Sequence, residues 1–399
     1  MGPRVELIIK LAERCNINCT YCYYFEGNSK RFMHRSPTIT QTTVDALCNF
    51  IARSLEQQEA GDFRLIFHGG EPLLIGKKKF ELLCKQLYES VDQTKVSLCL
   101  QTNATLIDSE WIDLFQKYRI SVSMSLDGTQ PMHDLSRVDK KGRGTYEQTI
   151  RGLRLLSEAV SDGKLDGVGC LVVVNPSFSG RDIYNHIVQD LGIRTLDFLL
   201  PDTTHDTFTG DMSSFSRYLI EVFDAWWDQK HKDVHLRFMK SVVSLLLGGP
   251  SFLGGFGGKL STAFTVSSDG DIELDDFLRV CGDDVIAVPI RLSDASLTSL
   301  TRTDTLMKIE REYAEIPLEC NQCAFKFVCR GGQLTHRFAK VDGFIRKSVY
   351  CGALYDLFEH AAHALVIDGI PIERIANRLK DLSPNHSKNF KSADSLALA

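Results

Sequence analysis

The first 200 residues alternate short apolar runs with stretches of helical periodicity, and this alternation limits the possible folds more than any other feature. Strands that alternate with helices form a parallel sheet with the helices outside it. Six such units in about 200 residues predict an α/β fold with a partial (β/α)6 barrel rather than a closed barrel of eight units. The predicted strands are Glu6–Leu11, Arg64–His68, Val96–Gln101, Ile120–Ser125, Val168–Val174 and Thr195–Leu200.

The periodic segments predict helices, and a break in composition predicts where the barrel ends. Seven of the eleven residues in Gly248–Gly258 are glycine or proline, which marks a boundary nearby. We divide the chain into a barrel (1–235), a cysteine-bearing region (236–370) and a C-terminal helix with a frayed tail (371–399). The predicted helices are Thr42–Glu56, Lys78–Val91, Ser109–Lys117, Tyr146–Ala159, Arg181–Leu191, Ser213–Lys230 and Ile372–Leu382.

Composition and charge exclude several classes of function. The chain has 46 Lys+Arg and 51 Asp+Glu, a formal net charge of −5, so it offers no basic excess to nucleic acid. No apolar run approaches the ~18 residues of a membrane span, and the start lacks a signal-peptide pattern. We therefore expect a cytoplasmic protein without nucleic-acid or membrane partners. Because the first strand begins within ten residues of the start, we expect no separate module ahead of it.

The chain has 12 cysteines, and their grouping carries the chemistry. In a reducing compartment, grouped cysteines bind metal or take part in catalysis more often than they form disulfides. Four cysteines lie outside the groups described below and are scattered among apolar neighbours, which indicates small buried hydrophobic residues. They are Cys48, Cys84, Cys99 and Cys170.

The first group is Cys15-Asn-Ile-Asn-Cys19-Thr-Tyr-Cys22, directly after the first predicted strand. Three cysteines separated by three and two residues can wrap one [4Fe–4S] cube and leave its fourth iron open to a chelating substrate. A zinc site is the alternative, but such sites are usually completed by a fourth protein ligand, and none lies nearby. The spacing therefore predicts an iron–sulfur cluster.

With Tyr21 before its last cysteine, this loop resembles the signature of the radical S-adenosylmethionine (SAM) enzymes. The resemblance implies that SAM chelates the open iron and is cleaved to methionine and a 5′-deoxyadenosyl radical. Three further motifs follow the second, third and fourth predicted strands, where barrel enzymes assemble their sites. They are His68-Gly69-Gly70-Glu71-Pro72, Gln101-Thr102-Asn103 and Ser125-Leu126-Asp127-Gly128.

The same resemblance implies roles for individual residues. The glycines would let the backbone approach the ligand, Glu71 would face the SAM ammonium group, and Ser125 and Arg137 would contact its ribose or carboxylate. The predicted SAM-binding residues are Tyr21, Gly69, Gly70, Glu71, Asn103, Ser125 and Arg137.

The second group supplies four thiolates, from Cys320, Cys323, Cys329 and Cys351, which is enough to close a metal site completely. A structural zinc ion is one alternative. The spacing also resembles the SPASM extension of peptide-modifying radical SAM enzymes, which carries auxiliary [4Fe–4S] clusters. The resemblance thus implies a C-terminal SPASM-like module.

This module departs from the full SPASM pattern at three places. Asp275 stands five residues after Gly270, where the pattern has cysteine, and Gln333 stands where it has another. No cysteine lies 9–15 residues before Gly270. These are ligands of the nearer auxiliary cluster, so we expect a truncated module with one auxiliary cluster. Cys281 is left over, either as a buried thiol or as a residue close to the substrate.

That truncation makes the chain resemble the maturases that form three-residue cyclophanes in ribosomally made peptides, joining an aromatic ring carbon to a β-carbon. Segments 330–338, 343–344 and 348–351 support the resemblance. The alternative is an anaerobic sulfatase maturase that oxidises Cys or Ser to formylglycine, but such enzymes usually keep both auxiliary clusters. An iron–sulfur sensor without catalysis would not need the SAM motifs. The implied partners are a precursor peptide and a reductant such as flavodoxin or ferredoxin.

Asp276 is the candidate catalytic base. In sulfatase-type maturases an aspartate directly follows the cysteine that Asp275 replaces here, and that aspartate accepts a proton. We expect Asp276 to be partly buried with a raised pKa. A solvated turn is the alternative. On a strand, only one of Asp275 and Asp276 would face the site.

Overall fold

The computed structural model describes residues 2–27, 29–228, 233–258, 260 and 263–380. The chain forms two compact units that are interleaved in the sequence. The first unit comprises Met1–Val173 and Ser261–Glu310, and the second comprises Val174–Leu260 and Arg311–Ala399. The Gly/Pro-rich stretch ends where the chain returns to the first unit. The domain borders at residues 235 and 370 stay predictions.

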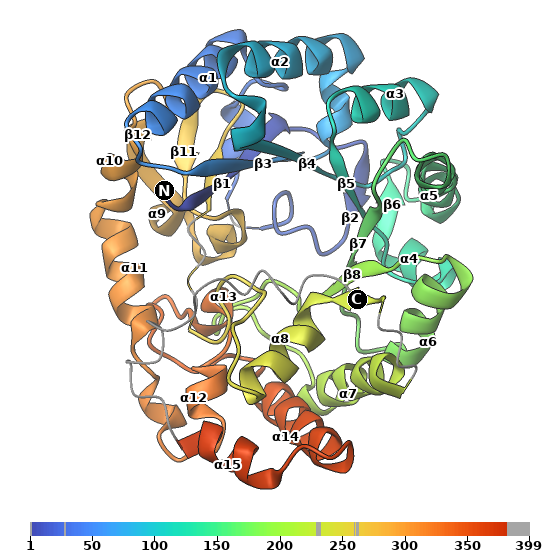
Figure 1. Ribbon diagram of the computed structural model, residues 1–399, viewed down its shortest axis with the longest axis vertical. Coiled ribbons are helices and arrows are strands. Elements are labelled where there is room, and N and C mark those ends of the chain that lie inside the picture. Colours follow the sequence, from blue (N-terminus) through green and yellow to red (C-terminus); the bar gives the residue numbers. More distant parts are fainter. Residues whose placement is uncertain (1, 28, 229–232, 259, 261–262, 381–399) are drawn as a thin grey trace. The chain divides into compact units, whose positions relative to one another are not determined.

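The first unit is built on a largely parallel sheet, drawn from blue to green in Figure 1, with β11 and β12 in yellow and amber at one edge. Its strands follow the order β12-β11-β10-β1-β3-β4-β5-β7. The parallel strands match predictions: β1 (Arg4–Ala12), β3 (Asp62–Gly69), β4 (Val96–Thr102), β5 (Ser121–Ser125) and β7 (Val168–Val173). The edge was not predicted: β10 (Phe264–Val266) pairs parallel with β1, and β11 (Asp271–Glu273) and β12 (Ala287–Arg291) continue antiparallel.

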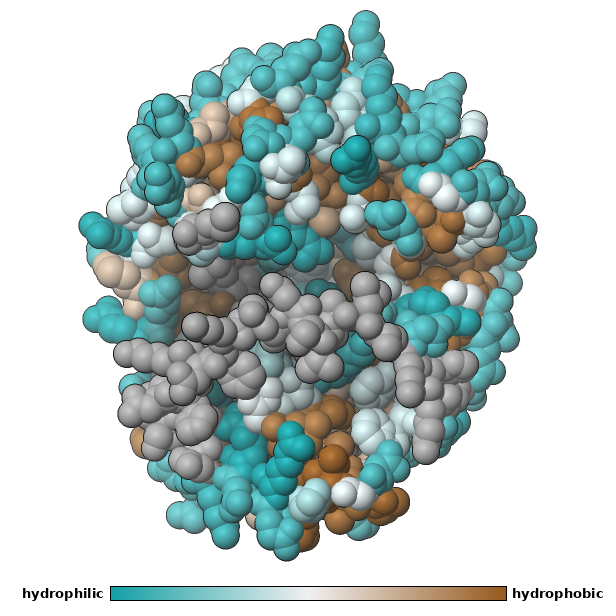
Figure 2. Space-filling view, in the orientation of Figure 1, coloured by the Kyte–Doolittle hydropathy of each residue, from teal (hydrophilic) through white to brown (hydrophobic). Residues whose placement is uncertain are grey.

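Helices cover the outer side of this sheet (Figure 1). Two of them begin at residues whose side chains cap the helix: the Thr40 side chain accepts a hydrogen bond from the Thr43 amide at 3.2 Å, and Asp108 accepts one from the Trp111 amide at 3.0 Å. Aromatic rings join sheet and helices, with ring centroids of Phe67 and Phe80 5.6 Å apart. Hydrophilic side chains predominate on the outward faces of α2 and α3 (Figure 2). The helices are α1 (Gln41–Glu56), α2 (Lys77–Ser90), α3 (Ser109–Lys117) and α5 (Tyr146–Ser161), which confirms those predictions.

Shorter elements complete the first unit. A two-stranded sheet pairs β2 (Ile17–Cys19) with β6 (Arg137–Asp139), beside α4 (Gln130–Ser136). The others are α9 (Asp283–Ile286), α10 (Leu297–Thr301) and the 3-10 helices η1 (Arg31–His34), η2 (Pro72–Ile75), η3 (Gln93–Lys95) and η5 (Asp276–Cys281). The chain passes into the second unit within α11 (Asp304–Ala314).

The second unit contains the sixth predicted strand, β8 (Thr195–Leu199), which pairs parallel with β9 (His235–Leu236). Helix α7 (Met212–Asp228) packs on α14 (Cys351–Ile367), where His360 Nε2 lies 2.5 Å from Asp224 Oδ1. The predicted helix Arg181–Leu191 is split into α6 (Gly180–Asn185) and a π-helical turn, η4 (His186–Asp190). The others are α8 (Arg237–Leu246), η6 (Leu318–Cys320), α12 (Lys326–Cys329), α13 (Leu334–Arg337) and α15 (Ile372–Lys380). The tail prediction beyond residue 380 lies outside the described residues.

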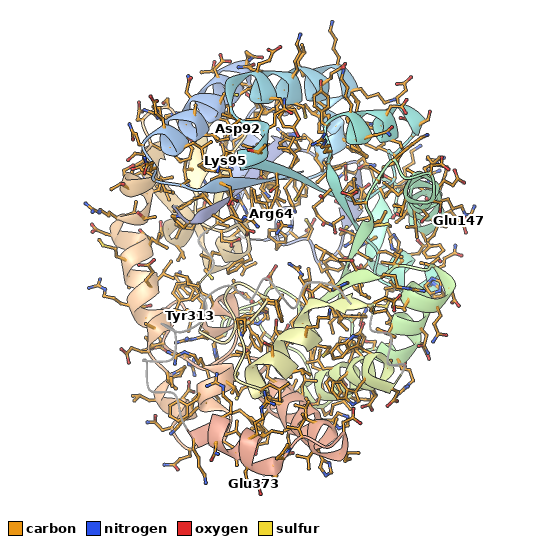
Figure 3. The ribbon with its side chains drawn as sticks, viewed as in Figure 1. Arg64, Asp92, Lys95, Glu147, Tyr313 and Glu373 are labelled. Carbon is orange, nitrogen blue, oxygen red and sulfur yellow. The ribbon has the colours of Figure 1, made fainter. Side chains whose placement is uncertain are left out.

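Among the described residues, no helix is both long enough and apolar enough to cross a membrane. The scattered cysteines are mostly as expected, since Cys48, Cys84 and Cys170 are buried. Cys99 is an exception: it is half-buried, and the Arg64 guanidinium (Figure 3) donates to its Sγ at 3.3 Å. Cys281, expected as a buried thiol, is half-buried as well.

Candidate active site

The three-cysteine loop follows the C-terminal end of β1. Its first sulfur lies beyond the strand, Cys19 is the last residue of β2, and the Cys22 amide donates to the Cys19 carbonyl at 3.2 Å. Burial raises the pKa of Cys15 to about 12 and that of Cys19 to about 11. Thiols in such surroundings ionise only when a positive centre binds them, which is the setting that metal ligation provides.

The donor set fits a cluster rather than one ion. No three or more His, Cys, Asp or Glu side chains within the described ranges converge closely enough to hold a single metal ion. A [4Fe–4S] cube distributes its cysteines over separate irons, so it needs no such convergence. Three thiolates from one short loop therefore fit that cube better than a tetrahedral zinc ion.

Gly69 and Gly70 bring the end of β3 against this loop. A Cβ on Gly69 would stand 2.2 Å from the Ala12 carbonyl oxygen, and one on Gly70 would stand 2.4 Å from that of Arg14. The close approach carries two backbone hydrogen bonds, from Gly70 to Ala12 at 2.8 Å and from Glu71 to Arg14 at 2.9 Å. The glycines thus allow the backbone to approach the cysteine loop, whereas the sequence suggested an approach to ligand.

Replacing Gly70 with Ala is expected to lower the free energy of unfolding by more than about 1 kcal/mol and to reduce SAM cleavage, because the methyl group displaces the cysteine loop. The control is Gly167→Ala, directly before β7, where a Cβ meets nothing within 4 Å. Denaturant titration and deoxyadenosine assays would check both effects. Equal changes in unfolding free energy and in deoxyadenosine formation in the two variants would contradict the steric argument.

Glu71 is fully buried and joins the ends of β3 and β4. Its carboxylate accepts hydrogen bonds from Thr102 Oγ1 and the Asn103 amide, both at 2.8 Å, and from the Leu73 amide at 3.1 Å. Burial raises its pKa to about 7 against these hydrogen bonds. In the structure Glu71 therefore holds the ends of β3 and β4 together through hydrogen bonds, and its contact with the SAM ammonium group stays a prediction.

Asn103 links the end of β4 to the cysteine loop. Its Nδ2 donates to Asn16 Oδ1 at 2.9 Å and lies 3.8 Å from Cys15 Sγ. Ser125, at the end of β5, accepts a hydrogen bond from Gln101 Nε2 at 2.8 Å. The motifs after β3 and β4 thus contact the first cysteine or its chain neighbours, and Ser125 is joined to the β4 motif through Gln101.

Arg137 is held by a carboxylate to which the sequence gave no role. Its Nε donates to Asp127 Oδ2 at 2.8 Å, and the Tyr21 hydroxyl donates to the same oxygen. The guanidinium also lies 3.9 Å from Cys19 Sγ and 5.5 Å from the centre of the Tyr21 ring. Asp127 therefore fixes both predicted SAM-binding side chains beside the second cysteine.

Asp276 opens the 3-10 helix η5, so the expectation that it lies on a strand is wrong. It is buried, while Asp275 is half-buried; only the preceding Asp269-Gly270 forms the hairpin turn. Lys10 Nζ lies 2.5 Å from Asp276 Oδ2, and the Tyr23 hydroxyl donates to the same oxygen. Burial alone would raise the pKa of Asp276, but the charges of Lys10 and Arg279 hold it well below the usual range. The expected raised pKa is therefore wrong.

Lys10 connects Asp276 to the Gly-Gly-Glu-Pro strand. Its fully buried ammonium lies 3.3 Å from His68 Nδ1, and burial lowers the pKa of His68 to about 4, so Nδ1 accepts this hydrogen bond. Sequence reasoning missed Lys10 and Arg279. A lysine inside the apolar run Leu7-Ile-Ile-Lys-Leu11 was the available signal, since buried charges need partners.

The second cysteine group lies wholly in the second unit. Its four residues line one cavity, together with the rings of Phe325 and Phe358. Burial raises the pKa of Cys320 to about 11, and nearby Cys351 and Cys323 raise it further. Four thiols around one apolar cavity fit an iron–sulfur cluster, whereas a zinc ion requires the close convergence that the described residues lack.

Comparison with known proteins agrees with this geometry. Residues 9–178 match the model of the Radical SAM superfamily. Along most of its length the chain is similar to anaerobic sulfatase-maturating enzymes. The cysteine-type enzyme of Clostridium perfringens (strain 13 / Type A) is 25% identical over 387 residues, covering 95% of this chain and 100% of the relative. The serine-type enzyme of Klebsiella aerogenes is 27% identical over 385 residues, covering 94% and 88%.

A solved structure shows the same fold. The structure described as native anSMEcpe with bound AdoMet and Cp18Cys peptide has a TM-score of 0.79 and 24% identity, covering 94% of this chain and 100% of that one. The α/β radical SAM fold is thus confirmed. These relatives carry the name of the alternative that the sequence left open, and they give no support to the cyclophane-forming subgroup.

Proposed function

We propose that this chain is a peptide maturase of the sulfatase-maturating type, which oxidises the β-carbon of a Cys or Ser side chain in a protein substrate. The observation that carries the proposal is similarity to such enzymes across both compact units, over 95% of this chain. A likeness limited to the barrel would support SAM cleavage alone. An electron donor such as flavodoxin or ferredoxin is the remaining partner.

Two sets of cysteines would hold the cofactors. Cys15, Cys19 and Cys22 fit a [4Fe–4S] cluster that, with SAM bound, supplies a 5′-deoxyadenosyl radical for hydrogen abstraction. Asn103 and Arg137 lie beside Cys15 and Cys19, where their N–H groups stabilise negative charge on sulfur. The second cysteine group fits one auxiliary [4Fe–4S] cluster that accepts an electron.

Asp276 is suited to take the proton. Oxidation of a Cys or Ser side chain removes one hydrogen atom from the β-carbon, and then one proton and one electron from the resulting radical. An S–H or O–H group attached to a carbon radical is far more acidic than the same group in the parent thiol or alcohol. A weakly basic carboxylate can therefore accept its proton. Lys10 and Tyr23 keep Asp276 ionised and oriented for this step.

The proposal is tested by incubating the reduced, reconstituted enzyme with SAM and peptides that contain Cys or Ser in a sulfatase-type sequence. We expect deoxyadenosine and an aldehyde that reacts with hydrazine reagents; Ser gives the aldehyde directly, and Cys gives it after water hydrolyses the thioaldehyde and hydrogen sulfide leaves. Replacing the target residue with Ala in the peptide is the matched control. Deoxyadenosine without any aldehyde from either peptide would contradict the proposal.

The cyclophane reaction stays the second candidate because of one observation. Asp275 and Gln333 stand where the nearer auxiliary cluster of the full SPASM pattern has ligands, so this chain differs there from enzymes with two auxiliary clusters. A crosslinked peptide would lose two hydrogens, give no aldehyde and resist fragmentation between the joined residues. Tandem mass spectrometry of co-expressed peptides distinguishes the two products.

Replacing Cys351 with Ala is expected to separate SAM cleavage from peptide oxidation. The variant loses one ligand of the auxiliary cluster but keeps the three-cysteine loop, so deoxyadenosine formation continues while oxidised peptide falls strongly. Quantifying both products in one reaction provides the measurement. Equal loss of both products in a well-folded variant would assign the second cysteine group a structural role only.

A further inference from the structure

Arg337, at the end of α13, is a fully buried arginine whose every N–H group is used. All its hydrogen bonds go to backbone carbonyls, and none to a side chain. Nε donates to Arg346 at 3.1 Å, Nη1 donates to Tyr313 and Arg330, both at 3.3 Å, and Nη2 donates to Glu312 and Glu315, both at 3.1 Å. Three stretches of chain are thus hydrogen-bonded to one guanidinium group.

This cation has no carboxylate to neutralise it. Across the described ranges no Asp or Glu side chain is paired with Arg337, and its guanidinium instead lies 5.0 Å from the centre of the Tyr313 ring, labelled in Figure 3. Carbonyl dipoles and an aromatic face solvate the ion but leave its full charge in place. Because a buried arginine does not lose its proton, an anion nearby must compensate it.

The residues nearest to Arg337 in space include those that directly follow Cys329. The Cδ of Arg337 would lie 3.5 Å from a Cβ on Gly331, two residues after Cys329. The carbonyl of Arg330 accepts a hydrogen bond from the guanidinium, and Arg330 stands between Cys329 and Gly331, which both line the cavity of the second cysteine group.

We propose that Arg337 is the buried counter-charge of the auxiliary iron–sulfur cluster and that it raises the reduction potential of that cluster. The inference rests on the proposed function for the source of the electron only. In the oxidation of the peptide, the substrate radical would give up one proton, to Asp276, and one electron, which an oxidised cluster held by the second cysteine group would accept. Four thiolates already make the site negative, so the added electron is costly unless a fixed positive charge lies close by.

The test compares two replacements of Arg337 in the full chain, reconstituted with both clusters. Arg337→Gln removes the charge and Arg337→Lys keeps it, although lysine cannot reproduce the five-donor fork. Arg330→Gln is the matched control, because Arg330 adjoins Cys329 but is half-buried and donates an exposed hydrogen bond to the Ala314 carbonyl. The midpoint potential of each cluster is measured by redox titration with electron paramagnetic resonance, and iron is counted.

We expect Arg337→Gln to shift the auxiliary potential to a more negative value, by more than Arg330→Gln does. Arg337→Lys should restore most of the shift, and the SAM-binding cluster should keep its potential in every variant. An unchanged potential in Arg337→Gln with full iron would overturn the proposal. If Arg337→Gln loses iron but Arg337→Lys retains the cluster, the result supports the role of the positive charge. If both variants lose the cluster, Arg337 has a structural role only and the proposal is overturned.

These readouts do not depend on the peptide. If no aldehyde forms with any substrate while the potentials shift as expected, the proposed function fails and the role of Arg337 stands. If aldehyde forms at the wild-type rate in Arg337→Gln and the auxiliary potential is unchanged, the proposed function stands and the role of Arg337 fails. The two proposals are thus separable in one set of preparations.

Discussion

Replacing Cys15, Cys19 and Cys22 together with Ala is expected to abolish SAM cleavage and to lower iron from about eight to about four per chain. The three thiols are the only ligands that this loop offers, whereas the four cysteines of the second group line their own cavity and keep their cluster. Iron analysis and a deoxyadenosine assay after anaerobic reconstitution provide the measurement.

The matched control for the triple variant replaces three cysteines that belong to neither group. Cys48, Cys84 and Cys170 are buried, so their replacement tests the general cost of losing thiols without touching a cluster. It should leave about eight irons and normal SAM cleavage. About twelve irons in the wild-type protein would contradict the single auxiliary cluster.

Asp276→Asn is expected to lower formation of oxidised peptide by on the order of a hundredfold or more, while both clusters and substrate-triggered deoxyadenosine formation remain. The reason is the loss of the carboxylate whose Oδ2 both Lys10 and Tyr23 contact. The variant should also lose on the order of 3 kcal/mol of unfolding free energy, because Lys10 and Arg279 keep their buried charges without this partner.

A double variant separates catalysis from stability. Lys10→Met combined with Asp276→Asn removes one buried charge of each sign, so it should recover much of the stability but none of the product. Asp275→Asn is the control for the neighbouring half-buried carboxylate and should behave as wild type. Normal product from Asp276→Asn together with loss in Asp275→Asn would mean that the other carboxylate is the base.

The sequence predicted the elements whose signals are local. Apolar runs and helical periodicity located β1, β3, β4, β5 and β7 of the first unit and the helices between them, because a buried parallel strand and an amphipathic helix each leave a short-range pattern. The cysteine groups were readable for the same reason. The edge strands β10, β11 and β12 were missed, because strands of three to five residues carry too little pattern to stand out.

The surroundings of the site residues could not be predicted in the same way. The sign of the pKa shift at Asp276 depends on Lys10, 266 positions away in sequence, so burial was foreseeable and its electrostatic outcome was not. The need for glycine at position 70 comes from the Arg14 carbonyl rather than from a ligand. Arg337 resembled any other basic residue, since its five partners are backbone atoms that no sequence motif identifies.

The pairing of β1 with β10 also dictates when the protein can fold. Leu7 pairs with Phe264, so about 250 residues must be synthesised after the first strand before its partner leaves the ribosome. At about 5–20 residues per second, that interval is roughly 10–50 s. Throughout it, one edge of an apolar strand stays unpaired and able to associate with other chains. Yield on expression should therefore depend on chaperones and on low temperature, and a chain cut before residue 261 would keep that edge open permanently.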